Sequence, residues 1–215
     1  AIAAAIDPEV VNDRAYGGAG IASTALIPPG FPWDPKVDGP AYDPELAKEL
    51  VAQAKAAGWD GKIRLLVQNA GATVPTGDAV ETMLRAAGME VVKDATKDTP
   101  QVIRQVFVNN DYDTVTWCYA MTPDDLLYLN LTQNLTGRYG YRSDAMDAAL
   151  RELRTAVTVE EKVAALEQIA RVWTEDVPAV SLVHFPSYVA WNDDVHGVRT
   201  TAGVVALYDK AWVSR

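Results

Sequence analysis

The sequence lacks three things that would restrict its fold or location. Its single cysteine, Cys118, cannot form an internal disulfide, and we interpret it as a small buried apolar residue. No apolar run approaches the roughly 18 residues that a membrane span requires. The opening residues, AIAAAID, have no basic region and no starting methionine, so they do not resemble a signal segment. We expect them to be the end of a helix that begins earlier in a longer protein.

Basic residues and histidines are also few. Lys and Arg number 19 against 29 Asp and Glu, and the net charge of −10 argues against nucleic acid and anionic membrane surfaces as partners. With two histidines and one cysteine we expect no metal site, and no motif indicates a cofactor. The sequence has no Gly-x-Ser-x-Gly elbow and no phosphate loop ending in Gly-Lys-Ser/Thr. About half of the 215 residues are apolar, which is enough for one large domain or two small ones.

Proline and glycine are concentrated in residues 17–42, which we expect to form an irregular arm. A helix follows, because Asp43 occupies an N-cap position, Pro44 the first helical position, and apolar residues recur at helical spacing up to Gly58. Asp7-Pro8 is a similar signal for an earlier helix.

From residue 62 short apolar segments alternate with helical patterns. We predict strands at 63–67, 89–92 and 113–119, a loop at 68–76, and helices that begin before Val80 and at Thr99-Pro100. Strands that alternate with helices indicate crossover connections and a parallel sheet, and therefore an α/β fold. Two further helices follow Ser143, and the second opens with the capping box Thr158-x-x-Glu161. The predicted final strands are 179–185 and 188–191.

Ligands of open parallel sheets collect beyond the carboxyl ends of the strands. In this sequence these ends are the loop after residue 67 and the segment WCYAMTP, and an Asn/Tyr-rich loop one helix later could fold over the same opening. Trp117 alternates with Val115 on one strand face, so it could be either a pocket wall or a core residue. The candidate ligand-binding residues are Gln68, Asn69, Trp117, Tyr119, Met121, Asn134, Arg138, Tyr139 and Tyr141.

Asp124 and Asp125 form the one carboxylate pair that suggests catalysis. Because they follow Thr122-Pro123, we interpret them as first-turn charges that complement a helix dipole. A carboxylate-dependent hydrolase remains the alternative to a binding protein, and a ligand-sensing module on the same fold is another.

Five segments, in order, resemble one family. AIAAAIDPEVV, LIPPGFPW followed by YDPELAKELVAQAKAAGW, AAGMEVV, YDTVTW, and the long segment from ALRELRTAVTVEEKV to WNDDVHGV are similar to the C-terminal lobe of bacterial ABC-importer solute-binding proteins of the oligopeptide, dipeptide and nickel group, family 5. The resemblance covers most of the chain.

The resemblance implies a periplasmic-binding-protein-like (type II) lobe with a mixed, mostly parallel sheet flanked by helices. It implies that residues 1–16 lead in from a missing N-terminal lobe, that residues 17–199 form the C-terminal ligand-binding lobe, and that residues 200–215 form a tail that returns toward the missing lobe. Family members are not enzymes. They capture a peptide-like or other small polar solute outside the cytoplasm, in the periplasm or as cell-surface lipoproteins, and deliver it to the permease subunits of an ABC transporter.

One position departs from the family pattern. The family's pocket tryptophan corresponds to Trp117, and peptide-binding relatives often carry an acidic residue three positions later, where it pairs with the ligand's amino terminus. This chain has Ala120 there. A methyl group cannot compensate a buried ammonium, so we expect a ligand without a free amino group at that point.

Overall fold

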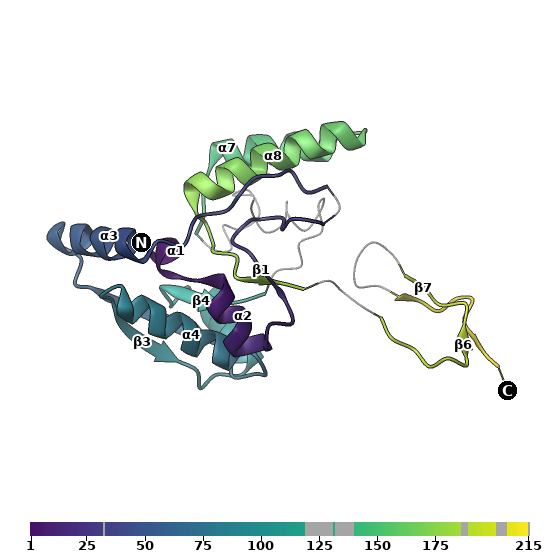
Figure 1. The fold of residues 1–215 in the computed structure, drawn as a ribbon, viewed down its shortest axis with the longest axis horizontal. Helices are drawn as coiled ribbons and strands as arrows, with labels where there is room; N and C mark the ends of the chain where they lie inside the picture. The colour runs from purple at the N-terminus through teal and green to yellow at the C-terminus, as the bar shows by residue number, and fades with distance from the viewer. Residues whose placement is uncertain (32, 119–130, 132–139, 186–188, 201–205, 215) are drawn as a thin grey trace. The chain divides into compact units, whose positions relative to one another are not determined.

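The computed structural model describes residues 1–31, 33–118, 131, 140–185, 189–200 and 206–214 (Figure 1). Compactness divides the chain into a unit of residues 1–184 and a second unit of residues 185–215. In the described part of the chain no helix is both long and apolar enough to cross a membrane. The predicted division into residues 1–16, 17–199 and 200–215 refers to the lobes of a longer protein and not to these compact units, and it stays a prediction.

A three-stranded parallel sheet lies at the centre of the first unit. Strands β2 (Lys62–Val67), β3 (Glu90–Asp94) and β4 (Thr114–Thr116) are arranged in the order β3-β2-β4. Leu66 pairs with Asp94 on one side of β2 and with Val115 on the other. The predicted α/β class and parallel arrangement are confirmed, and the third strand is shorter than predicted.

Four helices cover one face of this sheet: α1 (Ile2–Ala5), α2 (Pro8–Tyr16), α3 (Pro44–Ala56) and α4 (Thr73–Ala86) (Figure 1). Alternate residues of β2 point to this face, where they join a buried cluster. The cluster combines Ile63, Leu65 and Val67 with Val11, Ala47, Val51, Ala79, Val80 and Leu84. Burial of these side chains is the main force that holds the helices on the sheet.

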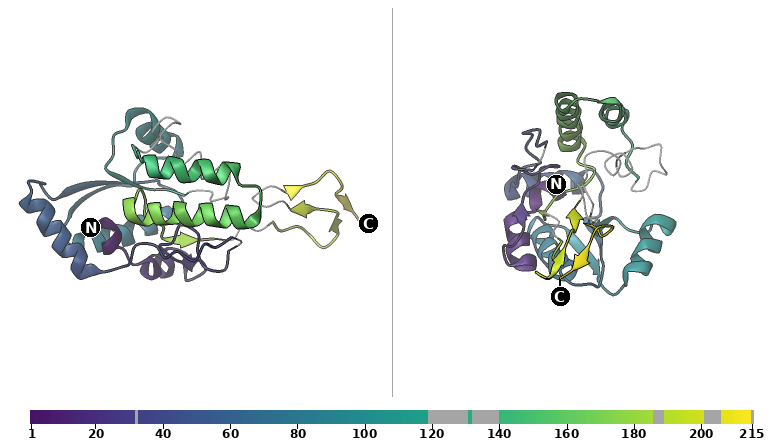
Figure 2. Two further views of the ribbon diagram at one scale, coloured as in Figure 1. Left: turned by 90° about the horizontal axis from the view of Figure 1, so that it is seen from above. Right: turned by 90° about the vertical axis from the view of Figure 1, so that its right-hand side faces the viewer.

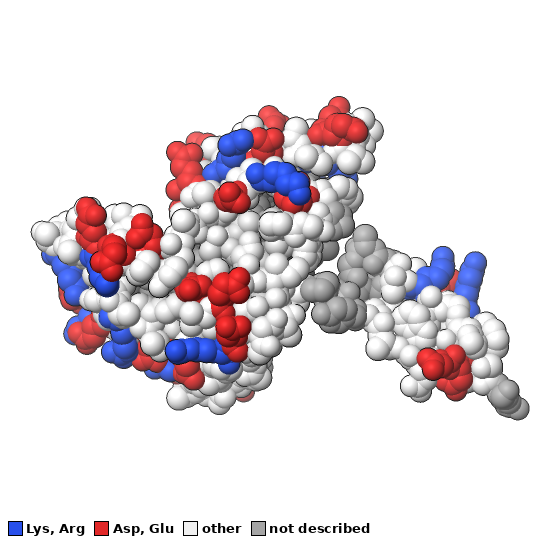
Figure 3. Space-filling model, viewed as in Figure 1, with Lys and Arg blue, Asp and Glu red and all other residues white. Residues whose placement is uncertain are grey.

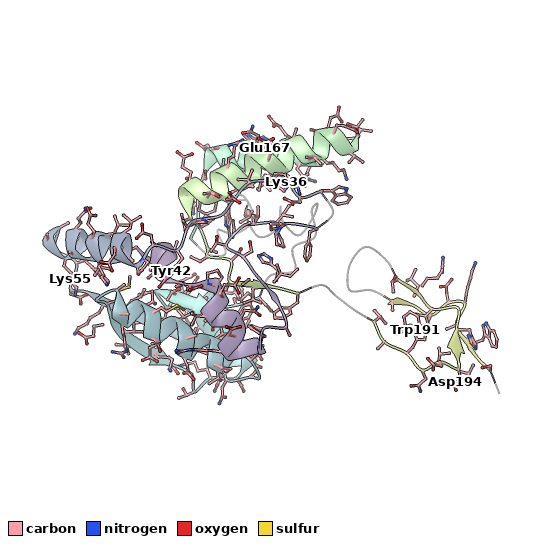
Figure 4. All side chains as sticks on the ribbon, in the orientation of Figure 1. Lys36, Tyr42, Lys55, Glu167, Trp191 and Asp194 are labelled. Atoms are coloured by element: carbon pink, nitrogen blue, oxygen red, sulfur yellow. The ribbon has the colours of Figure 1, made fainter. Side chains whose placement is uncertain are left out.

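The predicted helix starts are confirmed where proline follows a capping aspartate. The Asp7 carboxylate accepts a hydrogen bond from Glu9 N, and the Asp43 carboxylate accepts one from Leu46 N at 2.9 Å. Helix α4 begins inside the segment predicted as a loop, because Thr73 already has helical backbone without a side-chain cap. At the other end of α3, Lys55 donates to the Gly88 carbonyl, and Figure 4 shows it at that helix end.

The opposite face of the sheet is covered by α5 (Thr99–Arg104), which continues as the π-helical turn η1 (Gln105–Asn109). Asp98 caps α5 in a reciprocal capping box with Gln101. A small buried cluster of Leu66, Val102 and Val106 joins this layer to β2. The sheet therefore lies between two helical layers.

A third buried cluster joins the arm to the helices α7 (Asp144–Thr155) and α8 (Val159–Asp176), which lie side by side (Figure 2). Leu26 and Ile27 of the arm pack against Leu150 and Leu166, and Trp33 lies at the margin of the cluster. Ser143 caps α7, and the predicted Thr158–Glu161 capping box opens α8.

The two predicted final strands, 179–185 and 188–191, differ from the structure. Strand β5 (Val183–His184) pairs antiparallel with β1 (Ile21–Ala22). Residues 189–191 have no strand conformation, so the prediction of a strand at 188–191 is wrong for its described part.

The second unit contains two short antiparallel pairs. Strand β6 (Val195–His196) pairs with β9 (Trp212–Val213), and β7 (Arg199–Thr200) pairs with β8 (Ala206–Leu207). None of its described residues is buried, and Trp191, Tyr208 and Trp212 are among the exposed aromatic residues; Trp191 is labelled in Figure 4. Two-stranded pairs without a core are only marginally stable by themselves.

Candidate functional site

The carboxyl ends of β2 and β4 lie next to each other. The chain starts in the middle strand β2, adds β3 on one side, and then crosses to add β4 on the other. Such a reversal of strand order is the point where open α/β sheets bind ligands. The pairing of Val67 with Thr116 places Gln68 beside Trp117, so the structure brings these two predicted residues together.

Trp117 continues the face of β4 that carries Val115 and packs against the small cluster under α5. Its indole meets Phe107 of η1 edge-to-face, with 5.9 Å between ring centroids and an interplanar angle of 81°. The side chain is only half-buried. Trp117 therefore has a fixed orientation on one side and accessible aromatic surface on the other, as small-molecule sites need.

Gln68 and Asn69 are held by the segment that enters α5. The Gln68 carboxamide donates to Thr99 Oγ at 2.6 Å, and Asn69 N donates to the Lys97 carbonyl at 2.9 Å. The exposed Asn69 carboxamide forms no hydrogen bond within the described part of the chain. Gln68 thus supports the loop, while Asn69 is available to a ligand.

The loop from β3 to α5 is stabilised by its own charges. Asp94 accepts hydrogen bonds from Lys97 Nζ and from both the hydroxyl and the backbone nitrogen of Thr96. These contacts lower the pKa of Asp94 to about 2, and the hydrogen bond from Lys97 has the largest effect. The same loop places the Lys97 carbonyl where Asn69 N donates to it.

A hollow of about 480 Å³ begins at this loop and follows α5 into η1. It is lined by Lys97, Pro100, Gln101, Arg104, Gln105 and Asn109. Three of these side chains already have partners: Lys97 pairs with Asp94, the Gln101 carboxamide accepts from Asp98 N, and the Gln105 carboxamide donates to the Asp111 carbonyl. Lys97, one of the lining residues, connects the hollow to the edge at β2 through its carbonyl, which accepts from Asn69 N.

Tyr141 lies elsewhere, against the cluster between α7 and α8. Its hydroxyl donates to the carboxylate of Asp176, the last residue of α8. Burial and this carboxylate raise the pKa of Tyr141 to about 12. The contact fixes the chain next to α7. Tyr141 therefore has a structural role that the sequence did not indicate.

Cys118 is exposed, so its interpretation as a buried residue is wrong. Strand β4 ends at Thr116, two residues before Cys118, so the cysteine lies beyond the paired part of the sheet. Ala120 and the carboxylate pair lie outside the described residues, as do five of the predicted site residues: Tyr119, Met121, Asn134, Arg138 and Tyr139.

Two supporting residues were not predicted for the site: Phe107 behind the indole and Thr99 beside Gln68. Thr99-Pro100 was recognised as a helix start, but its hydrogen bond spans 31 residues and has no local signal. The described residues contain no cluster of three or more potential metal ligands.

The surface charge of the protein is mixed: acidic and basic side chains are interspersed on the face shown in Figure 3.

A family model described as "Bacterial extracellular solute-binding proteins, family 5 Middle" matches residues 1–139. A search of curated proteins found no significant match. Solved structures share the fold. The oligopeptide-binding protein AppA from Bacillus subtilis, in complex with a nonapeptide, has a TM-score of 0.73 and 20% identity, covering 100% of this chain and 46% of that one.

A dipeptide-binding protein from Pseudoalteromonas sp. SM9913, in complex with Met-Leu, has a TM-score of 0.77 and 19% identity, covering 99% of this chain and 44% of that one. A periplasmic oligopeptide-binding protein from Thermotoga maritima, with mannohexaose bound, has a TM-score of 0.69 and 18% identity, covering 85% of this chain and 40% of that one. The chain spans less than half of the length of these structures.

Proposed function

Since the chain belongs to family 5 of the bacterial extracellular solute-binding proteins, we propose that it is the C-terminal lobe of the substrate-binding component of an ABC importer. It captures a peptide-like or other small polar solute and does not transform it. The observation that carries this proposal is the half-buried Trp117 at the edge where β2 and β4 end together.

The ligand contacts proposed for this edge are the open side of the Trp117 indole and the free carboxamide of Asn69. An indole supplies apolar contact to a peptide side chain or a sugar ring, and a carboxamide both donates and accepts hydrogen bonds. Tyr119, Met121, Asn134, Arg138 and Tyr139 are further proposed contacts from the sequence. Tyr141 is the weakest member of the proposed set, because its hydroxyl already binds Asp176.

Ala120 favours a ligand without a free amino group at the position next to Trp117. Burying an unpaired ammonium is costly, and the short side chain of Ala120 offers it no counter-charge. We therefore expect N-acetylated peptides or oligosaccharides to bind more tightly than free-amino peptides.

The remaining parts of the proposal concern the longer protein. The missing N-terminal lobe supplies the other half of the site, residues 1–16 lead in from it, and residues 200–215 return toward it. The exposed aromatic residues of the second unit are consistent with a surface that another part of the protein covers. The partners are the permease transmembrane subunits, and the location is extracytoplasmic, in the periplasm or at the cell surface.

A thermal-shift screen of the two-lobed protein tests the proposal, because a ligand that binds the folded state raises its melting temperature. The panel contains short peptides, N-acetylated peptides, oligosaccharides and nickel chelates. In Trp117→Ala, at least about ten times more of any hit ligand should be needed for the same rise in melting temperature, because the variant loses an aromatic contact to the ligand.

Trp59→Ala is the matched control. Trp59 is also half-buried, but its indole nitrogen donates to the Lys62 carbonyl at the opposite, amino-terminal end of β2. An equal loss in both variants would contradict a site at the β2–β4 edge. Preferential stabilisation by free-amino peptides would contradict the role assigned to Ala120.

A further inference from the structure

Strand β4 leads directly into Trp117, yet it is only three residues long. Its pairing with β2 runs from Leu65–Thr114 to Val67–Thr116. A strand that is shifted by two residues keeps the same side chains on each face, because side chains alternate between the faces with a period of two. The alternation of side chains therefore does not by itself fix how far Trp117 reaches along the sheet.

Asp113, the residue that precedes β4, makes a different kind of contact with β2. Its carboxylate accepts a hydrogen bond at 2.7 Å from the backbone nitrogen of Arg64, which directly precedes the first β2 residue that pairs with β4. The Arg64 guanidinium also donates to this carboxylate, through Nε at 3.2 Å and through a terminal nitrogen at 3.0 Å. Three hydrogen bonds therefore join one aspartate to one residue of the neighbouring strand.

The same arginine reaches the turn that supports the indole. Its other terminal nitrogen pairs with Asp111, which follows η1. Asp111 N donates to the Gln105 carbonyl at 3.1 Å, and the Gln105 carboxamide donates to the Asp111 carbonyl at 2.6 Å. Gln105 opens η1, which carries Phe107 against Trp117. Arg64 therefore connects β2 both to the strand that leads to Trp117 and to the turn that packs on it.

Shifted registers lack these contacts. Moving β4 by two residues toward the amino end of β2 would bring Asp113 beside Lys62, whose nitrogen already donates to the Asp60 carboxylate at 2.9 Å. Trp117 would then lie beside Leu66 and no longer at the edge. The opposite shift would place the Asp113 carboxylate beside Leu66, in the buried cluster under α5, where an unpaired charge is costly.

We propose that Asp113 is a positioning residue that sets the register of β4 through Arg64 and thereby places Trp117 at the ligand-binding edge. This role rests on the proposed function, but the register is measured without a ligand, so the failure of one can be told from the failure of the other. Both side chains are about half exposed, and exposed ion pairs add little stability. The contacts therefore select one register more than they stabilise the unit.

The single cysteine of the chain makes the register measurable by electron paramagnetic resonance. In the whole chain carrying Ala56→Cys, nitroxide labels would lie at Cys118, beyond the end of β4, and at the end of α3, just before β2 begins; both positions are exposed. Adding Asp113→Ala should produce a shorter distance component, displaced by up to about 6.6 Å for a shift of two residues. An unchanged distance distribution would overturn the proposal.

Two variants separate the register from a general loss of charge. Asp113→Asn keeps an oxygen that can accept from Arg64 N, so it should retain the original distance. Asp209→Ala removes a similarly exposed aspartate that binds Arg199 in the second unit, and it should also leave the distance unchanged. A displacement in either variant as large as that in Asp113→Ala would contradict the role of the Arg64 contact.

The melting temperature distinguishes positioning from stabilisation. Asp113→Ala should lower it by no more than about 4 °C, as expected for an exposed ion pair in a chain of this size. A much larger fall together with an unchanged distance would show that the contact only stabilises the unit.

A measurement on the unsubstituted chain covers the case in which Asp113→Ala does not fold. The NMR shift of the Arg64 amide should follow the titration of the Asp113 carboxyl group, with a midpoint below the ordinary aspartate pKa, because the hydrogen bonds from Arg64 lower the pKa of Asp113. An Arg64 amide that does not respond to this titration would overturn the contact on which the proposal depends.

Discussion

Single residues decide how closely α4 approaches the sheet. Gly77 is buried, and a Cβ added to it would lie 2.5 Å from Cγ2 and 2.8 Å from Cγ1 of Val67. Real Cβ atoms do not tolerate such distances, and the short branched side chain of Val67 has little freedom to move. The glycine is therefore required by the packing of the helix on β2 and not by the helix itself.

Gly77→Ala should lower the free energy of unfolding by about 1–2 kcal/mol, because overpacking outweighs the gain of up to about 1 kcal/mol in helix propensity. Urea denaturation followed by circular dichroism measures this. Adding Val67→Ala removes the clashing methyl groups, so the two changes together should cost less than their sum. A higher unfolding midpoint for Gly77→Ala would contradict the clash.

Among the elements, the helices follow their local signals most closely. Pro44, Thr158 and Ser143 stand where the sequence placed them relative to their helices, since capping needs only neighbouring residues. Strand lengths follow local signals less well. Strand β4 ends at Thr116 although the apolar pattern continues, because strand pairing requires a neighbour and β2 ends at Val67.

Thr158→Ala tests the capping box at the start of α8. The Thr158 hydroxyl accepts from Glu161 N at 3.2 Å, and Glu161 accepts from Thr158 N at 3.0 Å. Its loss should cost about 1 kcal/mol of unfolding free energy in urea titrations. Thr155→Ala is the control, since its hydroxyl only donates back to the Arg151 and Glu152 carbonyls and should change stability little. Equal costs for both variants would show that capping is not the cause.

At the scale of the whole molecule, the two units differ in what holds them. The first has three buried clusters, whereas none of the described residues in the second unit is buried. Local opening is easiest where few apolar contacts must be broken. The second unit should therefore open first.

Limited trypsin digestion of the chain should cut first after Arg199 or Lys210 and leave a product that contains residues 1–184. Both residues are exposed in the second unit, where the two-residue pair that holds Arg199 has no buried residue behind it, while Lys62 and Lys93 lie in the parallel sheet that carries a buried cluster. Mass spectrometry of early time points identifies the first cut, and digestion in urea shows whether the sites are cut equally once the chain is unfolded. A first cut after Lys62 or Lys93 would contradict this order of stability.

The sequence by itself determined the α/β class, the parallel strands, the helix starts at Asp7, Asp43 and Thr158, and the family. Each of these depends on residues that are close together in the chain or on a pattern that repeats along it. It also placed Gln68 and Trp117 at strand ends, since strand ends are local features.

Only the tertiary structure decided which side chains at this edge are free. Gln68 binds Thr99, Trp117 leans on Phe107, and Tyr141 binds Asp176 instead of joining the edge. The same holds for the close contact of Gly77 with Val67 and for the tie between Arg64 and Asp113, which are 49 residues apart. These contacts arise when distant segments pack together, and no local pattern encodes the partner that each side chain meets.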